Sequence, residues 1–307
     1  MTSRRRIGTR LLIAAGAGAL AAAVWGVGIE RHLYVLRRVS VPVLEPGSAP
    51  LRVLHLSDIH MAPWQRRRQA WIASLASLRP DLVVNTGDNV GHVDGLRGVR
   101  AALAGFRGVP GVFVHGSNDV TAPSPRNPLR YFLGPSRRHR RATLIDPQAM
   151  DRFFTDDLGW TALDNTAATI QAAGRRIRAI GVGDAHHGQD RLDLIPGLVA
   201  EADPAEFTIG VTHAPYRRVL DALTENGADI VFAGHTHGGQ VAVPGFGALV
   251  ANCDLPLTQA KGLSRWRTDA RSIPLHVSAG LGHSIYAPVR FAVRPEATLL
   301  TLLPRPE

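Results

Sequence analysis

Short apolar runs that each end in a cluster of polar side chains recur along this chain and constrain its fold more than any other feature. Five such clusters follow one another in the order Asp58-Ile59-His60, Gly87-Asp88-Asn89, Gly116-Ser117-Asn118-Asp119, Thr212-His213-Ala214-Pro215 and Gly234-His235-Thr236-His237. A short apolar run bounded by turn residues is consistent with a buried strand. Because ligands collect beyond the carboxyl ends of strands in open α/β sheets, we expect the five clusters to converge on one site.

The chain between these clusters alternates between strand and helix patterns, which indicates βαβ units. We expect strands at 51–56, 81–85, 112–115, 207–211 and 230–233, and helices at 65–78, 99–106 and 215–225. Apolar runs at 240–243, 273–278 and 297–303, punctuated by Gly and Pro, indicate a β-rich C-terminal third.

Three of the clusters carry oxygen ligands at equal intervals along the chain. Asp58, Asp88 and Asn118 are each 30 residues apart, about the length of one strand-helix repeat. Asp58 and His60 lie two residues apart in a turn, so both side chains can face one ion. Asp88 comes from the middle of the three strands and is the natural bridge between two cations.

The last two clusters contribute imidazoles. His235 and His237 alternate around Thr236, so both rings can reach one pocket from an extended segment, and His213 completes the set. Carboxylate, imidazole and amide ligands without a thiolate favour a site for Mn, Fe or Zn of the catalytic kind over the structural zinc site of a zinc finger. We therefore expect two divalent metal ions, about 3.5–4 Å apart, that together activate a hydroxide and neutralise a phosphoryl group.

The motifs resemble those of the calcineurin-like metallophosphoesterases, from about residue 51 to residue 303. The run from Gly234 to Gln240, followed by Pro244, is similar to a bacterial subgroup with N-terminal export signals or anchors. The segments 280–282, 288–290 and 294–296 fit the C-terminal pattern of that subgroup. The resemblance implies a four-layer αββα sandwich of two mixed β-sheets flanked by helices, here preceded by one N-terminal hydrophobic helix.

The resemblance also implies a ligand set for each ion and a reaction. Asp58, His60, Asp88 and His237 would hold one metal, and Asp88, Asn118, His213 and His235 would hold the other. The implied activity is that of a dinuclear metal-dependent phosphoesterase. Phosphodiester or pyrophosphate bonds, including those of phospholipid-like substrates, would be hydrolysed by a metal-bridging hydroxide.

The third motif departs from the family pattern, which is Gly-Asn-His followed by an acid. Aligned on the glycine, Ser117 replaces the ligand; aligned on the start of the strand, Asn118 keeps the ligand role and Asp119 takes the place of the histidine. We prefer the second alignment, because serine is a poor substitute for an amide oxygen. Neither alignment supplies the catalytic histidine, so Asp119 and His92 are the candidate general acids.

The other histidines near the motifs are given structural roles. His115 is expected to pack under the site, and the pair His186-His187 to lie in a loop rather than to hold a third metal. His283, in a glycine-rich loop, is a pocket-lining candidate to which we assign no role.

The N-terminus has the features of an export signal or a membrane anchor. Arg4, Arg5, Arg6 and Arg10 precede an uncharged stretch at 11–29, which as a helix spans about 28 Å. Both an uncleaved anchor and a signal peptide cut near 21–23 fit this pattern, and 3–7 partly resembles a twin-arginine signal. The excess of positive charge before the stretch places the catalytic part outside the cytoplasm.

The rest of the chain divides into a linker and one catalytic domain. We expect residues 1–30 to form the basic region and anchor or signal, 31–50 an extended tether or edge segment, and 51–307 the metallophosphoesterase domain. Within it, 121–146 carries six arginines. This insertion is either a solvated surface segment or a basic flap over the active site or membrane.

Composition limits the remaining alternatives. The net charge of +10 comes almost entirely from arginine, and Cys253 is the single cysteine, which excludes an internal disulfide and a cysteine-based zinc site. A nucleic-acid binder would rest on the arginine excess alone, and the N-terminal segment argues against it. The stronger alternative is a metal-binding interaction protein with weak catalysis, because the usual histidine is absent.

Overall fold

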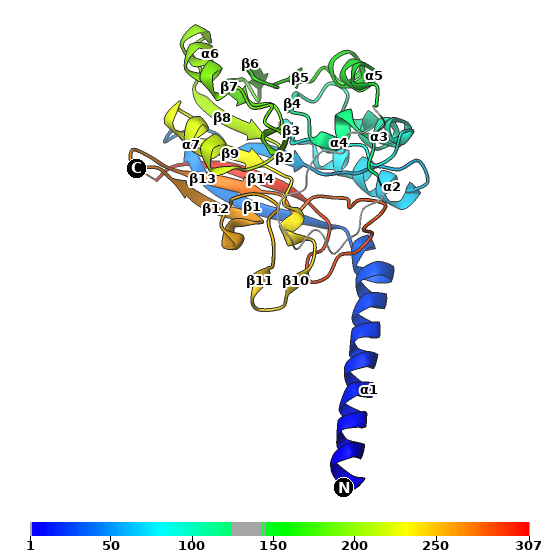
Figure 1. The fold of residues 1–307 in the computed structure, drawn as a ribbon. Coiled ribbons are helices and arrows are strands. Elements are labelled where there is room, and N and C mark those ends of the chain that lie inside the picture. Colours follow the sequence, from blue (N-terminus) through cyan, green and yellow to red (C-terminus); the bar gives the residue numbers. More distant parts are fainter. Residues whose placement is uncertain (1, 125–142, 144, 307) are drawn as a thin grey trace.

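Two six-stranded mixed β-sheets pack face to face between helices, with one long helix extending away from them (Figure 1). The computed structural model describes residues 2–124, 143 and 145–306. The predicted four-layer sandwich with an N-terminal helix is confirmed. The six arginines of the predicted basic insertion, between 126 and 141, lie outside the described residues.

The first sheet carries the first three motifs. Its strands, in spatial order, are β1 (Val35–Leu44), β14 (Glu296–Pro304), β2 (Leu51–Leu56), β3 (Leu82–Asn85), β4 (Gly111–Phe113) and β5 (Thr161–Ala162). The strands from β2 to β5 are parallel, whereas β14 runs antiparallel to β2 and parallel to β1. The carboxyl ends of β2, β3 and β4 therefore meet at one edge.

The second sheet carries the last two motifs. Its order is β12 (Gly262–Arg267), β13 (Ser272–Val277), β9 (Ile230–Ala233), β8 (Phe207–Thr212), β7 (Arg175–Gly181) and β6 (Thr166–Ala172). The strands from β13 to β7 are parallel, and an antiparallel strand closes each edge. A separate hairpin pairs β10 (Ala242–Val243) with β11 (Gly247–Ala248).

Helices cover the two outer faces. Those on the first sheet's side are α2 (Arg66–Ser74), α3 (Gly95–Leu103), α4 (Ser117–Val120) and α5 (Pro147–Arg152); the others are α6 (Ile195–Glu201) and α7 (Arg217–Glu225). Three apolar layers fill the space between the four structural layers. Alternation along each strand divides its residues between them: Val53 of β2 faces the layer between the sheets, and Leu54 faces the helices.

The segment at 31–50 belongs to the sheet. Of the two forms expected for it, tether or edge segment, the structure contains the edge strand β1, which is paired with β14 over most of its length. Val41 and Val43 lie in the apolar layer between the sheets, and Val39 packs against it. The edge position also accommodates Pro42, which has no N–H to donate to a neighbouring strand. The sheet therefore begins at Val35 rather than at Leu51.

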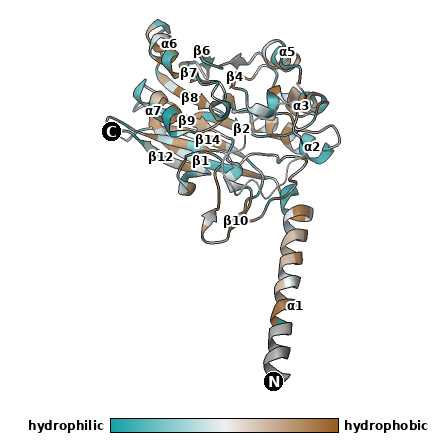
Figure 2. Ribbon diagram, viewed as in Figure 1, coloured by the Kyte–Doolittle hydropathy of each residue, from teal (hydrophilic) through white to brown (hydrophobic). Residues whose placement is uncertain are grey.

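The N-terminal helix stands apart from the sandwich. Helix α1 (Thr2–Val24) continues through a π-helical turn (Trp25–Ile29), and Arg10–His32 is long and apolar enough to cross a membrane. Signal sequences share these properties. Figure 2 colours much of this exposed helix as hydrophobic.

A partly buried histidine just after β4 joins that strand's end to two other segments. Nδ1 and Nε2 of His115 lie 2.7 Å and 2.8 Å from carboxylate oxygens of Asp164 and Asp151. Burial opposes its protonation, but the two carboxylates outweigh burial and raise the pKa of His115 well above its usual 6.5. His115 thus packs at the base of the third motif as an imidazolium.

We expect His115→Gln to reduce the free energy of unfolding by about 1 kcal/mol in mild acid, because two partly buried charge-assisted hydrogen bonds are lost. A raised folded-state pKa contributes stability that is complete below the unfolded value near 6.5 and lost as pH rises through the folded value. Denaturant unfolding across this range should therefore show a loss that shrinks as pH rises. Asp151→Asn should reproduce part of the effect, and a pH-independent loss would contradict the assignment.

Candidate metal centre

All seven predicted ligands lie in one cluster where the carboxyl ends of the two sheets meet. Backbone pairing continues beyond the strands and holds the loops in register: the Asp58 N–H donates to Gly87 O, and the Gly234 N–H donates to His213 O, both at 2.9 Å. The backbone N–H of His235 donates to the carboxylate of Asp58 at 3.0 Å, which joins the two sheets. The convergence predicted from strand ends is therefore what the structure contains.

Asp58, His60 and His237 form one group of donors. One ligand atom from each lies within 4.8 Å of the others. The Nε2 atoms of His60 and His237 are 3.1 Å apart, and Nε2 of His237 is 3.5 Å from Oδ1 of Asp58. Two imidazole nitrogens bound to one ion at about 2.0–2.1 Å would be separated by roughly this distance.

Asp88 connects this group to the second one. Its Oδ2 lies 3.4 Å from Nε2 of His60 and 3.8 Å from Nε2 of His213, so one oxygen faces a donor from each predicted set. The side-chain amide of Asn118 lies 2.6 Å from the same oxygen. The ring of His235 contacts that of His213, with centroids 5.2 Å apart. This arrangement fits Asp88 as a bridge and places Asn118, not Ser117, beside it.

Two of the buried imidazoles have the neutral state that a metal ligand needs, and the third lies in a field that favours positive charge. Burial lowers the pKa of His60 to about 4 and that of His235 to about 3, so both are neutral at physiological pH. Burial would also lower the pKa of His213, but Asp88, Asp184 and Asp58 together raise it to about 9. The same negative field that favours a proton on His213 would favour a cation.

The donor set fits divalent metal ions. Nε2 of His213 and Nδ1 of His60 are buried and make no hydrogen bond among the described residues. Nδ1 of His213 is 2.7 Å from the carbonyl of Thr86, so Nδ1 carries a proton, and displacement of the other proton by a cation would leave the Nε2 lone pair to bind it. A buried nitrogen acceptor of this kind, beside two carboxylates, is what a metal ligand provides.

Five of the seven ligands have strained backbone conformations. Asp58, His60, Asp88, His235 and His237 all have φ between 42° and 68°. This left-handed region costs non-glycine residues about 1–3 kcal/mol each, and such strain concentrates at functional sites. The strain turns each side chain inward immediately after its strand ends.

Two glycines of the motifs make this close approach possible. A Cβ on Gly116 would clash with the carboxylate of Asp88 and the ring of His213. A Cβ on Gly234 would clash with the side chains of Ser57 and Asp58. The space at both positions is therefore needed by the ligands themselves.

Asp119 lies beneath the ligands and does not face the open side of the site. Its carboxylate accepts backbone N–H bonds from Asp88 at 2.7 Å, Asn89 at 2.6 Å and Gly116 at 3.0 Å. Burial, with the neighbouring Asp88, raises its pKa to about 6. A general acid must reach the leaving group, and this side chain has no exposed surface. Its contacts do not support the predicted proton transfer and indicate that Asp119 positions the Asp88 loop.

The other predicted acid, His92, lies on the surface of the loop after β3. Its ring packs edge-on against Trp64, with centroids 5.0 Å apart, and Nδ1 accepts a hydrogen bond from the backbone of Asp94. The side chain is partly exposed.

His186 and His187 occupy a loop after β7, as expected, but one of them contacts the centre. The ring of His186 lies 4.4 Å, centroid to centroid, from that of His235, and its Nδ1 is 3.0 Å from the hydroxyl of Tyr216. His187 pairs with Asp184 at 2.8 Å. His283 is buried against Arg68, with a nitrogen-to-nitrogen distance of 3.4 Å.

A buried chain of hydrogen bonds behind Asp58 was not predicted from the sequence. The hydroxyl of Ser57 donates to Oδ2 of Asp58 at 2.5 Å, and that of Thr86 donates to Ser57 at 2.6 Å. Thr86 must then accept from Nε2 of His55, at 3.0 Å. Burial lowers the pKa of both His55 and His276, so Nδ1 of neutral His55 accepts from Nδ1 of His276, at 2.8 Å. We call these four residues the Asp58 relay; every donor in it points towards the carboxylate.

Two buried arginines hold the loops that carry the ligands. Arg68 donates to the carbonyls of Ile59 and His60, at 2.8 Å and 3.0 Å. Arg290 donates to the carbonyls of Ala279 and Gly280, and its Nη2 lies 3.1 Å from Nδ1 of His237. Part of the arginine excess is therefore structural.

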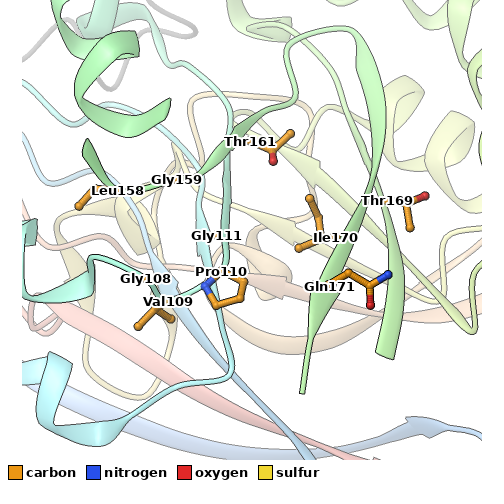
Figure 3. Close-up of a pocket in the computed structure, with 10 residues that line it drawn as sticks. All are labelled: Gly108, Val109, Pro110, Gly111, Leu158, Gly159, Thr161, Thr169, Ile170 and Gln171. Carbon is orange, nitrogen blue, oxygen red and sulfur yellow. The ribbon is translucent and has the colours of Figure 1, made fainter. Parts of the chain in front are cut away.

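The structure also has a shallow pocket away from the centre. It encloses about 350 Å³ between the edges of the two sheets and is lined by residues 108–111, Leu158, Gly159, Thr161 and 169–171 (Figure 3). None of the lining side chains is ionisable. We assign no chemistry to it.

Comparison with known proteins gives a family match across the motifs. Residues 51–239 match the sequence model for calcineurin-like phosphoesterases, which confirms the resemblance drawn from the motifs. The UDP-2,3-diacylglucosamine pyrophosphatase LpxG of Chlamydia trachomatis is 25% identical, covering 92% of this chain and 93% of its own. The metallophosphoesterase YkuE of Bacillus subtilis is 23% identical, over 98% and 97%. The phosphodiesterase YaeI of Escherichia coli is 25% identical, over 89% and 90%.

The Asp58 relay predicts that Thr86→Val weakens metal binding by about 10–100-fold, the usual effect of removing a group that orients a ligand. Valine keeps the shape of threonine but can neither accept the hydrogen bond from His55 nor donate one to Ser57. Calorimetric titration of the metal-free protein with Mn²⁺ would measure the change, and Thr86→Ser should restore most of the affinity.

Thr298→Val is the matched control. The hydroxyl of Thr298 is buried in the same sheet but makes no hydrogen bond among the described residues, so its replacement should leave metal affinity unchanged. Equal affinities for the Thr86→Val and Thr298→Val proteins would show that the relay does not act on the metal centre.

Proposed function

Since the chain belongs to the calcineurin-like phosphoesterase family and is therefore a phosphoester hydrolase, we propose that it uses two divalent cations to cleave phosphodiester or pyrophosphate bonds. The observation that carries this proposal is the cluster of seven candidate ligands, in which Asp88 lies among the other six and all but Asn118 are buried. Asp88 facing both groups of donors supports a dinuclear rather than a mononuclear centre.

Each cation would have its own ligands. Asp58, His60 and His237 would hold one ion, Asn118, His213 and His235 the other, and Asp88 would bridge them. Bound Mn, Fe or Zn would activate a water molecule and neutralise charge on the phosphoryl group. The protein fixes the donors through the Asp58 relay, Asp119 and the two buried arginines, so little reorganisation is needed on binding.

The substrate class rests on relatives and on the N-terminal helix. Two relatives are named as a pyrophosphatase of a diacylated nucleotide sugar and as a phosphodiesterase. The apolar stretch Arg10–His32 would keep the enzyme at a membrane. We propose an uncleaved anchor, a catalytic domain outside the cytoplasm and a lipid-linked phosphoester as substrate.

The third motif sets a limit on the chemistry. With no histidine there, and with Asp119 bound to backbone amides, His92 remains the candidate proton donor near the motifs. General-acid assistance contributes about 10²–10⁴-fold. An enzyme without it would favour substrates with good leaving groups.

The absent histidine also favours a second candidate function. A protein that binds two metals but turns over slowly could serve as a metal-dependent interaction module. It would contain two metals per chain by elemental analysis but show no hydrolysis above that of the metal-free protein.

We expect Asp88→Asn to abolish hydrolysis of bis-p-nitrophenyl phosphate by the Mn²⁺-loaded protein and to lower its metal content, because the proposed bridge loses its charge. The exposed Asp193, paired with Arg191 at the surface, offers a matched control, and Asp193→Asn should leave both properties intact. Lack of turnover by the unmodified protein with Mn, Fe, Co and Zn would refute the enzymatic proposal.

Substitution of the two acid candidates should separate their roles. Asp119→Asn should lower metal occupancy, since an amide cannot accept all the N–H bonds that the carboxylate accepts. His92→Ala should leave metal content unchanged. It should slow hydrolysis of phenyl phosphodiesters more than that of p-nitrophenyl phosphodiesters, because phenol is the poorer leaving group. An equal effect of His92→Ala on both esters would remove His92 from the mechanism.

A further inference from the structure

We propose that the β10–β11 hairpin is a second membrane contact, which inserts its apolar tip into the bilayer beside α1 and holds the metal centre at the membrane surface. The proposal rests on the membrane anchoring proposed above. It adds the element that meets the lipid and implies that the phosphoester is taken from the bilayer surface.

The hairpin has the composition of a membrane-inserting loop. Residues 241–251 read Val-Ala-Val-Pro-Gly-Phe-Gly-Ala-Leu-Val-Ala, without one polar side chain. Phe246, at the tip, is 76% exposed, and Val243 and Leu249 are 44% and 38% exposed. Apolar side chains gathered at one projecting tip are unfavourable in water and favourable at a membrane interface.

The hairpin follows the last predicted metal-ligand motif directly in the chain. Gln240 follows His237 by three residues, and its side chain donates to the carbonyl of Ala287 at 2.9 Å. The N–H of Ala242 donates to Phe291 O at 2.9 Å, and that of Phe291 donates to Gln240 O at 3.1 Å. The base of the hairpin is therefore tied to residues 287–291.

The same segment binds the end of the N-terminal helix. The Arg290 N–H donates to the carbonyl of Gly26 at 3.1 Å, and the Ala292 N–H donates to the buried carboxylate of Glu30 at 3.0 Å. A Cβ on Gly26 would press against Arg290 O. Since the guanidinium of Arg290 reaches His237, the helix end, the hairpin base and the candidate metal centre are all hydrogen-bonded to one segment, residues 287–292.

The direction of the hairpin fits one membrane plane. It projects from the end of the sandwich at which α1 leaves, in the same direction as that helix, and its tip reaches the level of the last turns of the helix in this view (Figure 1). Those turns carry exposed Trp25, Val27 and Ile29 and belong to the stretch that can cross a membrane. A bilayer crossed by this helix would thus meet the tip, whereas α6 lies at the opposite end.

The test is the depth of a spin label in the full chain, reconstituted in nanodiscs of phosphatidylcholine and phosphatidylglycerol. Phe246→Cys and Val243→Cys, each in a Cys253→Ala background, would carry a nitroxide. Leu194→Cys, beside α6, is the control, because Leu194 is also an exposed apolar residue but lies at the far end. Collision rates with oxygen and with a water-soluble nickel chelate would be measured.

We expect the labels at 243 and 246 to collide several-fold more with oxygen than with nickel, and the label at 194 to show the reverse. Nickel accessibility at 246 equal to that at 194 would overturn the proposal. A second variant, Phe246→Ser, should slow hydrolysis of a phosphodiester lipid in vesicles while leaving that of soluble bis-p-nitrophenyl phosphate intact. Equal rates for the variant and the unmodified protein on both substrates would also contradict it. If the unmodified protein did not hydrolyse soluble bis-p-nitrophenyl phosphate, the proposed enzymatic function would be contradicted. The spin-label measurement does not depend on activity, so it would still test the membrane contact.

Discussion

The carboxylate of Asp119 holds together the two loops on which the metal centre depends. It binds the backbone amides of Asp88 and Asn89, after β3, and that of Gly116, after β4. These bonds fix the left-handed turn that points the Asp88 side chain inward. Asp88 in turn lies between His60 of the first sheet and His213 of the second. Without this support, the strained turn would relax and the two groups of donors would separate.

A polar scaffold surrounds the ligands inside an otherwise apolar sandwich. The Asp58 relay runs between the sheets, and Arg68 and Arg290 satisfy carbonyls of the ligand loops. Buried polar groups are costly unless every partner is present, so such networks specify one arrangement of the loops. The left-handed turns and the scaffold are complementary. The turns orient the candidate ligand side chains towards one another, and the hydrogen bonds stabilise the turns.

The departure in the third motif changes the chemistry more than the architecture. Asn118 lies beside Asp88, as a ligand would, and the acid after it has the buried supporting position. What is missing is the imidazole that would face a leaving group. The structure thus brings together all seven predicted metal donors, and in the proposed reaction the proton donor would come from another loop, such as that of His92, or from solvent.

The sequence predicted most of the sandwich and all seven donors, because both depend on local patterns. Strands such as β2 and β9 are short apolar runs, and their polar ends necessarily meet when neighbouring strands are parallel. The sequence does not decide whether 31–50 is a tether or an edge strand. Val39, Val41 and Val43 alternate as a half-buried strand does, but Pro42 and the following prolines weaken that signal.

The sequence could not predict the roles of residues whose hydrogen-bond partners lie far away along the chain. His55 and His276 are 221 positions apart and gain a role only when the sheets pack against each other. Asp119 appeared as an acid in a turn, and only its contacts showed that its oxygens are occupied by backbone amides. The sequence by itself determined which side chains are candidate metal ligands, because ligand type and strand-end position are local properties. The tertiary structure decided which side chains support them and which apolar side chains are exposed, because hydrogen-bond partners and exposure are set by packing.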